Sequence, residues 1–152
     1  MRTARALILA TLLLLTPLSL LATPATAADT SVNADTTWSG AVVLTGNVTV
    51  MNGSTLTLAP GTTVDGGDGY WIRVEGTLSA SNSDFFSSQV PLTSGSHGAG
   101  LWTGIYVTNK GHAILSEVTI ENAKTAIKVE GYLSANKVTI KDSYIGINVI
   151  GS

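Results

Sequence analysis

The stretch Val74–Asn82 reads VEGTLSASN, and a close copy, VEGYLSANK, stands further along the chain at Val129–Lys137. In both copies apolar and polar residues alternate, which is typical of a strand with one buried face. The Glu-Gly pair in each copy is typical of a turn. The repeated phrase therefore predicts that the same strand, turn and strand recur along a chain built from repeated units.

Ile-x-Val triplets give the length of the repeat. They begin at Ile72, Ile105, Ile127 and Ile147, and the first of these three intervals is much longer than the other two. A period of about 20 to 22 residues fits if the longest interval contains an insertion, which we place in the polar, glycine-rich segment Ser87–Gly100. A unit this short buries its apolar side only by stacking on its neighbours. We therefore expect an all-β fold, a single-stranded right-handed parallel β-helix solenoid of about five to six coils, with three short strands per coil.

Residues 1–27 have the pattern of a secretory signal peptide. Arg2 and Arg5 precede an apolar run that continues to Leu21, and Pro24–Ala27 supplies small residues for a cleavage site. An uncleaved membrane anchor is the alternative, but polar residues and a proline interrupt the run before it reaches the roughly 20 apolar residues of a span. We expect cleavage after Ala27, a β-helix domain over residues 28–152, and a secreted or cell-surface location without a membrane span.

Composition argues against several classes of partner. Without Arg2 and Arg5 the chain has six basic residues against ten acidic ones, a formal charge near minus four. Nucleic acids and anionic membranes require a basic face, so neither is expected as a partner. The chain has no cysteine, and therefore no disulfide, thiolate nucleophile or zinc thiolate site. No phosphate-binding glycine motif leads into a helix, and we expect no cofactor.

Several segments resemble one known family. WSG at Trp38–Gly40, PGTTV at Pro60–Val64, LWTGIYV at Leu101–Val107 and SEVTIENA at Ser116–Ala123 are similar to coils of secreted right-handed parallel β-helix repeat proteins, which have the pectate-lyase-like superfamily architecture. The resemblance covers residues 35–152 and implies the fold. It implies no single activity, because that superfamily holds polysaccharide lyases, surface adhesins and proteins without a known activity.

The last residues, Val149–Ser152, stop on a strand in the middle of the repeat pattern. Solenoids usually end in a capping element that covers the last apolar layer. The missing cap favours a chain truncated at its C-terminus, and end-to-end contact with another chain is the alternative cover.

One outward row carries the candidate ligand face. The residue between the two inward positions of each triplet faces outward, which places Arg73, Tyr106 and Lys128 in consecutive coils beside Trp71. Exposed rings on a rigid sheet suit the face of a sugar, whereas Trp102, in a Trp-x-Gly corner, is expected to pack. The plainer alternative is a solvated surface on which both cations pair with the glutamates two positions further along. We expect a polysaccharide or cell-envelope glycan as the partner.

The sequence predicts no catalytic residue and no metal ligand. Pectate-lyase-like enzymes hold calcium in clustered acidic residues beside an arginine, and the resemblance does not extend to such a cluster. Asp65 and Asp68 are the nearest candidates, but their segment, DGGDG, is typical of a turn. Glu75 and Glu130 are expected two coils apart, and neither has the apolar surroundings that would divide a carboxylate pair into acid and base.

Two weaker signals remain. Thr49, Thr119 and Thr139 each stand at the centre of a Val-Thr-Val or Val-Thr-Ile strand, as a threonine row on an ice-binding face would. Asn47 and Asn52 begin N-glycosylation sequons, whose use depends on the source organism.

We predict a secreted or cell-surface structural or binding module that is non-catalytic as it stands. The main alternative is the N-terminal part of a polysaccharide lyase or glycoside hydrolase, and a weaker alternative is an ice-binding protein. The repeat decides the architecture, whereas the choice among these functions depends on few residues.

Overall fold

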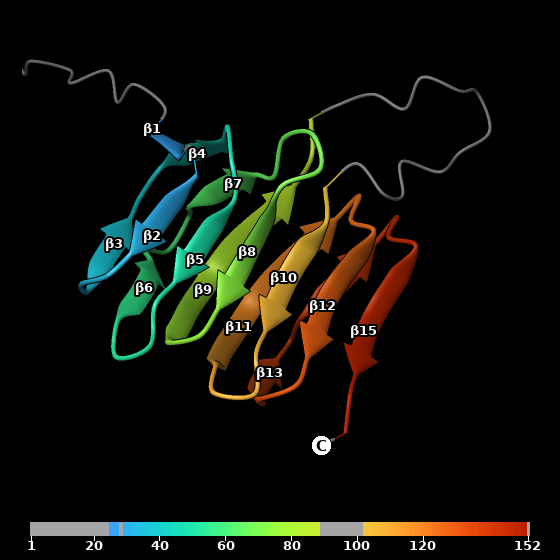
Figure 1. Ribbon diagram of the computed structural model, residues 1–152. Coiled ribbons are helices and arrows are strands. Elements are labelled where there is room, and N and C mark those ends of the chain that lie inside the picture. Colours follow the sequence, from blue (N-terminus) through green and yellow to red (C-terminus); the bar gives the residue numbers. More distant parts are fainter. Residues whose placement is uncertain (1–24, 28, 89–101, 152) are drawn as a thin grey trace, which may run out of the picture.

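The computed structural model describes residues 25–27, 29–88 and 102–151, and these residues form strands and turns without a helix (Figure 1). The strands stack as a β-solenoid of about five turns with three strands in each coil. The predicted all-β parallel β-helix is therefore confirmed.

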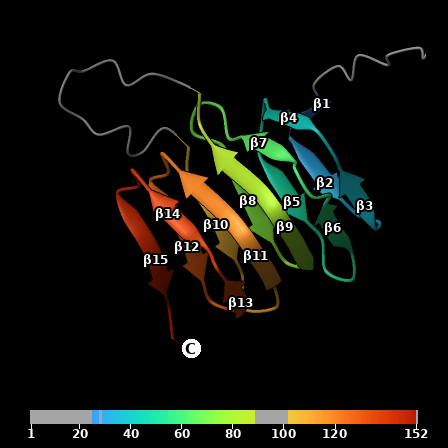
Figure 2. The same ribbon diagram turned by 180° about the vertical axis from the view of Figure 1, so that it is seen from behind.

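Two sheets run the length of the solenoid: the six-stranded sheet faces the viewer in Figure 1, and the nine-stranded sheet faces the viewer in Figure 2. The six-stranded sheet contains β2 (Thr30–Val32), β5 (Val48–Val50), β8 (Trp71–Val74), β10 (Gly104–Val107), β12 (Thr125–Val129) and β15 (Ile145–Val149). The nine-stranded sheet contains β1 (Ala25–Ala27), β3 (Thr36–Trp38), β4 (Ala41–Leu44), β6 (Thr55–Leu58), β7 (Thr63–Asp65), β9 (Thr77–Phe86), β11 (His112–Glu121), β13 (Tyr132–Asn136) and β14 (Thr139–Lys141). All pairings between these strands are parallel, as expected when each coil lies on the one before it.

The pairing register confirms the repeat. Isoleucines of successive coils pair directly, in the order Ile72, Ile105, Ile127 and Ile147. Thr77 and Tyr132 both pair with His112, so the two copies of the opening phrase occupy the same position two coils apart. The coil between the first two isoleucines therefore holds an insertion, as predicted. Most of the predicted loop, residues 89–100, lies outside the described residues.

The core is a stack of inward side chains between the sheets. Alternation along a strand turns every second residue inward, and Val74, Leu78 and Ala80 of the repeated phrase are each at most 2% exposed. Full burial of one such valine or leucine contributes about 1.5–3 kcal/mol. Each coil is thus stabilised through its neighbours, without the disulfides that the chain lacks.

Trp102 fills part of this core. Its indole is fully buried, stacks on Phe85 with 6.3 Å between ring centroids, and donates through Nε1 to the carbonyl oxygen of Glu121 at 2.9 Å. Gly66 leaves space for the ring, because a Cβ at this position would lie 2.5 Å from ring atoms. The prediction that Trp102 packs at a corner is confirmed.

Two kinds of corner explain the composition of the repeated phrase. A Cβ at Gly76 or Gly111 would lie 2.2 or 2.0 Å from a backbone carbonyl oxygen of the preceding coil, so only glycine fits. The following corner uses the left-handed backbone region, where Asn82, Glu117 and Lys137 stand in one row with φ of 46°, 56° and 53°. Asparagine adopts this conformation more readily than glutamate or lysine.

The three threonines that the sequence offered as a row do not share one. Thr119 and Thr139 pair on the nine-stranded sheet, whereas Thr49 lies on the six-stranded sheet and pairs with Arg73. A Val-Thr-Val motif does not indicate which sheet its strand joins, because alternation is the same in both. The ice-binding alternative therefore loses the row on which it depended.

Three predictions concern the ends of the solenoid. Ala25–Ala27, which the predicted cleavage would remove, forms β1 and pairs with β4. In the last coil Ile147 is 47% exposed, whereas its partner Ile127 is fully buried. Signal cleavage, truncation and end-to-end contact remain predictions.

Candidate functional site

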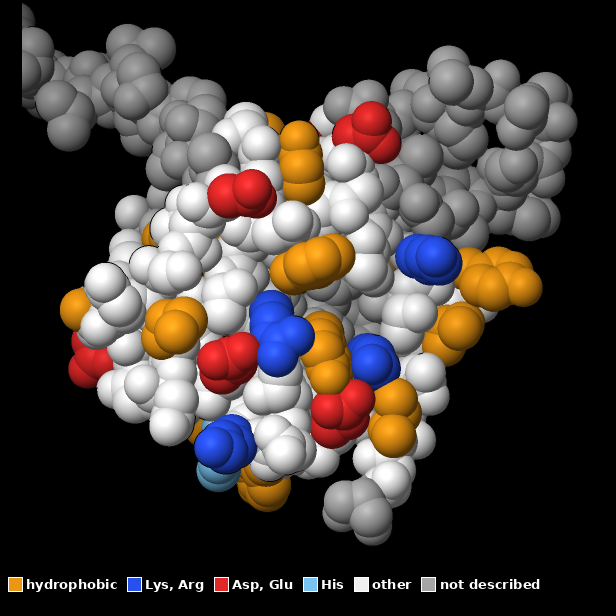
Figure 3. Space-filling view, in the orientation of Figure 1, with side chains coloured by type: hydrophobic (Ala, Val, Ile, Leu, Met, Phe, Trp, Pro, Cys, Tyr) orange, Lys and Arg blue, Asp and Glu red, His pale blue; other side chains and the backbone are white. Residues whose placement is uncertain are grey.

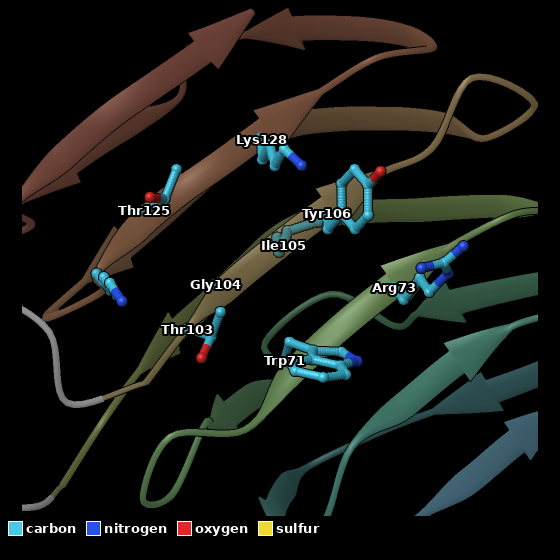
Figure 4. A pocket seen from close by; sticks show the side chains of 9 residues that line it. Trp71, Arg73, Thr103, Gly104, Ile105, Tyr106, Thr125 and Lys128 are labelled. Atoms are coloured by element: carbon cyan, nitrogen blue, oxygen red, sulfur yellow. The ribbon is translucent and has the colours of Figure 1, made fainter. Parts of the chain in front are cut away.

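The outer face of the six-stranded sheet brings the four predicted residues together. Arg73 on β8, Tyr106 on β10 and Lys128 on β12 pair in one outward row. Trp71 lies two residues before Arg73, on the same side of β8. All four line a hollow of about 360 Å³, which we call the Trp71 hollow. Figure 3 shows charged and hydrophobic side chains gathered on this face, and Figure 4 shows the hollow from close by.

We define the charged row as Arg73, Tyr106 and Lys128 with their glutamates Glu75 and Glu130. The charged groups of this row find their partners within the row. The guanidinium carbon of Arg73 lies 5.3 Å from the centre of the Tyr106 ring, and Nζ of Lys128 lies 4.1 Å from it. Nε of Arg73 donates to Oε1 of Glu75 at 2.8 Å. Nζ of Lys128 lies 3.3 Å from Oε1 of Glu130. The two predicted ion pairs are therefore present, and the cations also hold the phenol ring between them.

The Tyr106 hydroxyl couples the charged row across coils. Its hydrogen bond to the Glu130 carboxylate is the main reason that the pKa of Tyr106 is raised and the pKa of Glu130 is lowered. Lys128 acts in the same direction on Glu130, because a neighbouring cation favours the ionised carboxylate. Tyr106 thus keeps its proton and Glu130 keeps its charge at neutral pH.

Trp71 is the candidate residue whose ring remains available. Its side chain is 41% exposed, and its backbone N–H donates to Oδ1 of Asn47 at 3.3 Å, which fixes the start of β8. The ring of Tyr106, by contrast, has cations against it. A ligand that requires an open aromatic face would therefore meet Trp71 rather than Tyr106.

Gly104 forms the floor of the Trp71 hollow. It pairs with Trp71 in the outward register, where any other residue would place a side chain. Its φ is +108°, and a Cβ there would lie 1.8 Å from the carbonyl oxygen of Thr125. Figure 4 shows Gly104 between Trp71 and Thr125. Any residue other than glycine at this position of β10 would therefore collide with the backbone of β12.

A β-bulge forms the side of the hollow opposite Trp71. Trp102 bridges to Ala123 and Ile105 pairs with Ile127, so one extra residue enters the second strand between these two pairs before β12 resumes its register. The neighbours Ala126 and Ile127 are both fully buried, and the neighbours Lys124 and Thr125 both line the hollow. Regular alternation would turn one of Lys124 and Thr125 inward. The bulge thus points two consecutive polar side chains at one site, as bulges commonly do.

Lys124 is an exposed cation without an acidic partner. All ten acidic residues of the chain lie in the described part. The four ion pairs found there join glutamates to Arg73, Lys128, Lys137 and Lys141, and none involves Lys124. Reasoning from the sequence missed Lys124 and Gly104, because regular alternation was assumed. The signal that could have found them is the extra residue between Ala123 and Ile127, relative to the segment from Trp102 to Ile105.

Thr108 and Asp65 are two polar residues whose side chains serve turns. Thr108 occupies the position between Glu75 and Glu130 in neighbouring coils, but it is buried, and its hydroxyl donates to the carbonyl oxygen of Val74 at 3.0 Å. The outward row of Glu75 and Glu130 is interrupted because Thr108 closes a corner.

In DGGDG, Oδ1 of Asp65 accepts the N–H groups of Gly67 at 3.0 Å and Ser88 at 3.1 Å. This carboxylate therefore serves the turn, as the sequence suggested.

A second hollow of about 320 Å³ lies on the nine-stranded sheet. Its lining consists of Thr63, Asp84, Phe85, Phe86, Thr119, Glu121 and Lys141. Lys141 neutralises Glu121 at 3.0 Å. Within the described residues no group of three or more histidines and carboxylates could hold a metal ion.

A comparison with protein-family models, with curated proteins and with solved structures finds no match for this chain. No helix in the described part is long and apolar enough to cross a membrane. The Trp71 hollow and the residues around it are therefore the features of the molecule that bear on function.

Proposed function

We propose that the protein is a secreted or cell-surface module that binds carbohydrate or cell-envelope glycan in the Trp71 hollow and does not alter it chemically. The observation that carries the proposal is the 41% exposed indole of Trp71 at the edge of a hollow whose lining also includes threonine hydroxyls and cationic side chains. Flat aromatic rings stack on the apolar faces of sugars, while hydroxyl and ammonium groups orient the polar substituents.

The rigid setting of the hollow supports binding. Trp71 stands on β8, which is paired on both sides by β5 and β10. The Thr103 hydroxyl donates to the carbonyl oxygen of Gly69 at 2.7 Å. This hydrogen bond holds the hydroxyl oxygen of Thr103 in one orientation. A preorganised site loses less conformational entropy when a ligand binds.

The state of the nearby carboxylates supports a non-catalytic role. A general acid needs a pKa raised toward neutrality. Glu75 is paired with Arg73, and Glu130 accepts from Tyr106 and has a lowered pKa. Both groups are held as charged partners of cations, which suits a supporting wall better than proton transfer.

Glycan-array binding with the Trp71→Ala variant tests the proposal. Loss of an exposed aromatic anchor is expected to weaken binding at least about tenfold. Trp71 is the most exposed of the three tryptophans, since Trp102 is buried and Trp38 is partly buried against the core, so a bound sugar should also change the tryptophan emission of the native protein.

The matched control is Tyr144→Ala, which removes a 78% exposed ring that does not line the hollow. Far-UV circular dichroism and the urea midpoint show whether each variant keeps its fold. Equal binding by the Trp71 variant and the native protein, or no binding of the native protein to any glycan, would contradict the proposal. Release of shortened sugars in the same assay would favour a glycan-degrading enzyme instead.

A further inference from the structure

We infer that the Trp71 hollow accepts an anionic substituent of the bound glycan, a carboxylate, sulfate or phosphate group, at the ammonium group of Lys124. This inference rests on the proposed glycan binding and adds the charge of the ligand to it. It comes from the missing acidic partner of Lys124 and from the bulge that places this residue, whereas the glycan proposal depends on the exposed ring of Trp71.

The charges around the hollow are unequally satisfied. Three cations line it: Arg73, Lys124 and Lys128. Arg73 and Lys128 are neutralised by Glu75 and Glu130, at 2.8 and 3.3 Å. Lys124 has no ion pair with any acidic side chain, although all of these lie in the described part of the chain. The hollow therefore carries one excess positive charge in a protein whose formal charge is −2.

The bulge places this charge opposite the aromatic ring. Trp71, Gly104 and Thr125 lie on three successive strands, so the backbones of the outer two are two strand spacings apart, about 10 Å. Gly104, which carries no side chain, lines the hollow between them. A sugar ring stacked on Trp71 would thus lie over Gly104 and direct a substituent toward Lys124 and Thr125.

Lys124 and Thr125 favour an anionic substituent over a neutral one. The Thr125 hydroxyl can donate to an oxyanion, and the ammonium group adds a charge-assisted hydrogen bond, which is stronger than a neutral one. A neutral hydroxyl would leave the excess charge of the hollow unmatched. Electrostatic complementarity of this kind acts mainly on specificity, so the difference should appear between matched ligands.

Matched oligosaccharides test the inference. Each sugar backbone is presented in a neutral form and with carboxymethyl, sulfate or phosphate groups, and affinities are measured by isothermal titration calorimetry. The native protein should bind the anionic forms about fivefold more tightly, as expected for a partly exposed charged pair. Lys124→Gln should remove this preference and leave the neutral forms unaffected. Lys110→Gln, which removes another exposed lysine that does not line the hollow, is the control.

The outcomes separate this inference from the proposed function. Equal affinity for neutral and anionic forms, or a preference that survives Lys124→Gln, overturns the anionic subsite and leaves glycan binding intact. Unchanged binding in Trp71→Ala overturns the glycan proposal at this hollow. Comparing the affinities for the carboxymethyl, sulfate and phosphate forms shows which anionic group the hollow binds most tightly.

A second measurement applies if no oligosaccharide binds. Glucuronate, glucose 6-sulfate, glucose 6-phosphate and plain glucose are titrated at millimolar concentration while amide resonances are followed by NMR. The anionic sugars should shift the amides of Thr103, Gly104 and Thr125, and Lys124→Gln should abolish these shifts. Shifts that are absent, or that glucose reproduces, overturn the inference.

Discussion

The charged row and the Trp71 hollow occupy the same strands, but the side chains of the row have partners within it, whereas Trp71 and Lys124 in the hollow do not. In the charged row the cations of Arg73 and Lys128 have both a carboxylate and the ring of Tyr106 as partners. In the hollow the indole of Trp71 is exposed and Lys124 lacks an acidic partner. The difference shows that conspicuous charges on a β-helix face can be structural, and that the groups left free to meet a ligand are those that lack such partners.

Replacing the floor of the hollow should have the largest effect. Gly104→Ala places a Cβ 1.8 Å from the Thr125 carbonyl oxygen at a φ of +108°, so the bulge must move. We expect a loss of about 3–5 kcal/mol in the free energy of unfolding, measured with urea. Gly69→Ala, at a φ of +83° with open space around it, should cost only about 1–2 kcal/mol. Equal losses would show that close approach is not what keeps Gly104 free of a side chain.

Removing the ring at the centre of the charged row should have the next largest effect. Tyr106→Ala deprives both cations of their aromatic partner and Glu130 of its hydrogen bond, with an expected cost of about 2 kcal/mol. Tyr106→Phe keeps the ring and loses only the hydrogen bond to Glu130, so it should cost clearly less than Tyr106→Ala. Urea unfolding measures both. If the phenylalanine variant loses as much as the alanine variant, the contacts of the ring with the cations contribute nothing.

A single cation of the charged row should matter less. Arg73→Gln removes an ion pair and a cation–π contact, and we expect it to cost about 1 kcal/mol. Lys137→Gln removes only an ion pair with Glu117 at the surface, which should cost about 0.5 kcal/mol or less. Both losses should shrink in concentrated salt, because screening weakens exposed pairs. A larger loss for Lys137→Gln would reverse this ranking.

The pH dependence of stability should be the smallest effect. The pKa of Glu130 is lowered in the fold, so its contribution is complete above its ordinary value of 4.5 and is lost as the pH falls through the folded value. The pKa of Tyr106 is raised above 10.0, so its contribution is lost as the pH rises through that raised value. Thermal unfolding of the native protein and Glu130→Gln, followed from neutral to strongly acidic pH, should therefore converge at the acidic end. Parallel curves would contradict the coupling.

Most of the fold could be predicted from the sequence because every coil repeats the same alternation of inward and outward residues. Alternation identified the inward residues Val74, Leu78 and Ala80, and the spacing of the triplets identified which coils are neighbours. Both signals are properties of the backbone that recur in every coil. The assignment of strands to sheets was less secure, as Thr49 shows, since two sheets with the same period cannot be distinguished by alternation.

The candidate site was predicted only in part. Alternation placed Trp71, Arg73, Tyr106 and Lys128 on one face, and the structure brings all four around one hollow. It could not indicate that three of them satisfy one another, because side-chain contacts across coils depend on rotamers. Gly104 and Lys124 were missed because a bulge is a local exception to the period from which everything else was derived.

The bulge also makes the hollow sensitive to the reading of a single codon. Loss of one residue from the segment between Ala123 and Ile127 would restore the spacing that Trp102 and Ile105 have on the neighbouring strand. Two residues instead of three would then separate Ala123 from Ile127, so the side of the hollow opposite Trp71 would be rebuilt. A one-residue deletion in this segment would thus leave a continuous solenoid with a changed hollow.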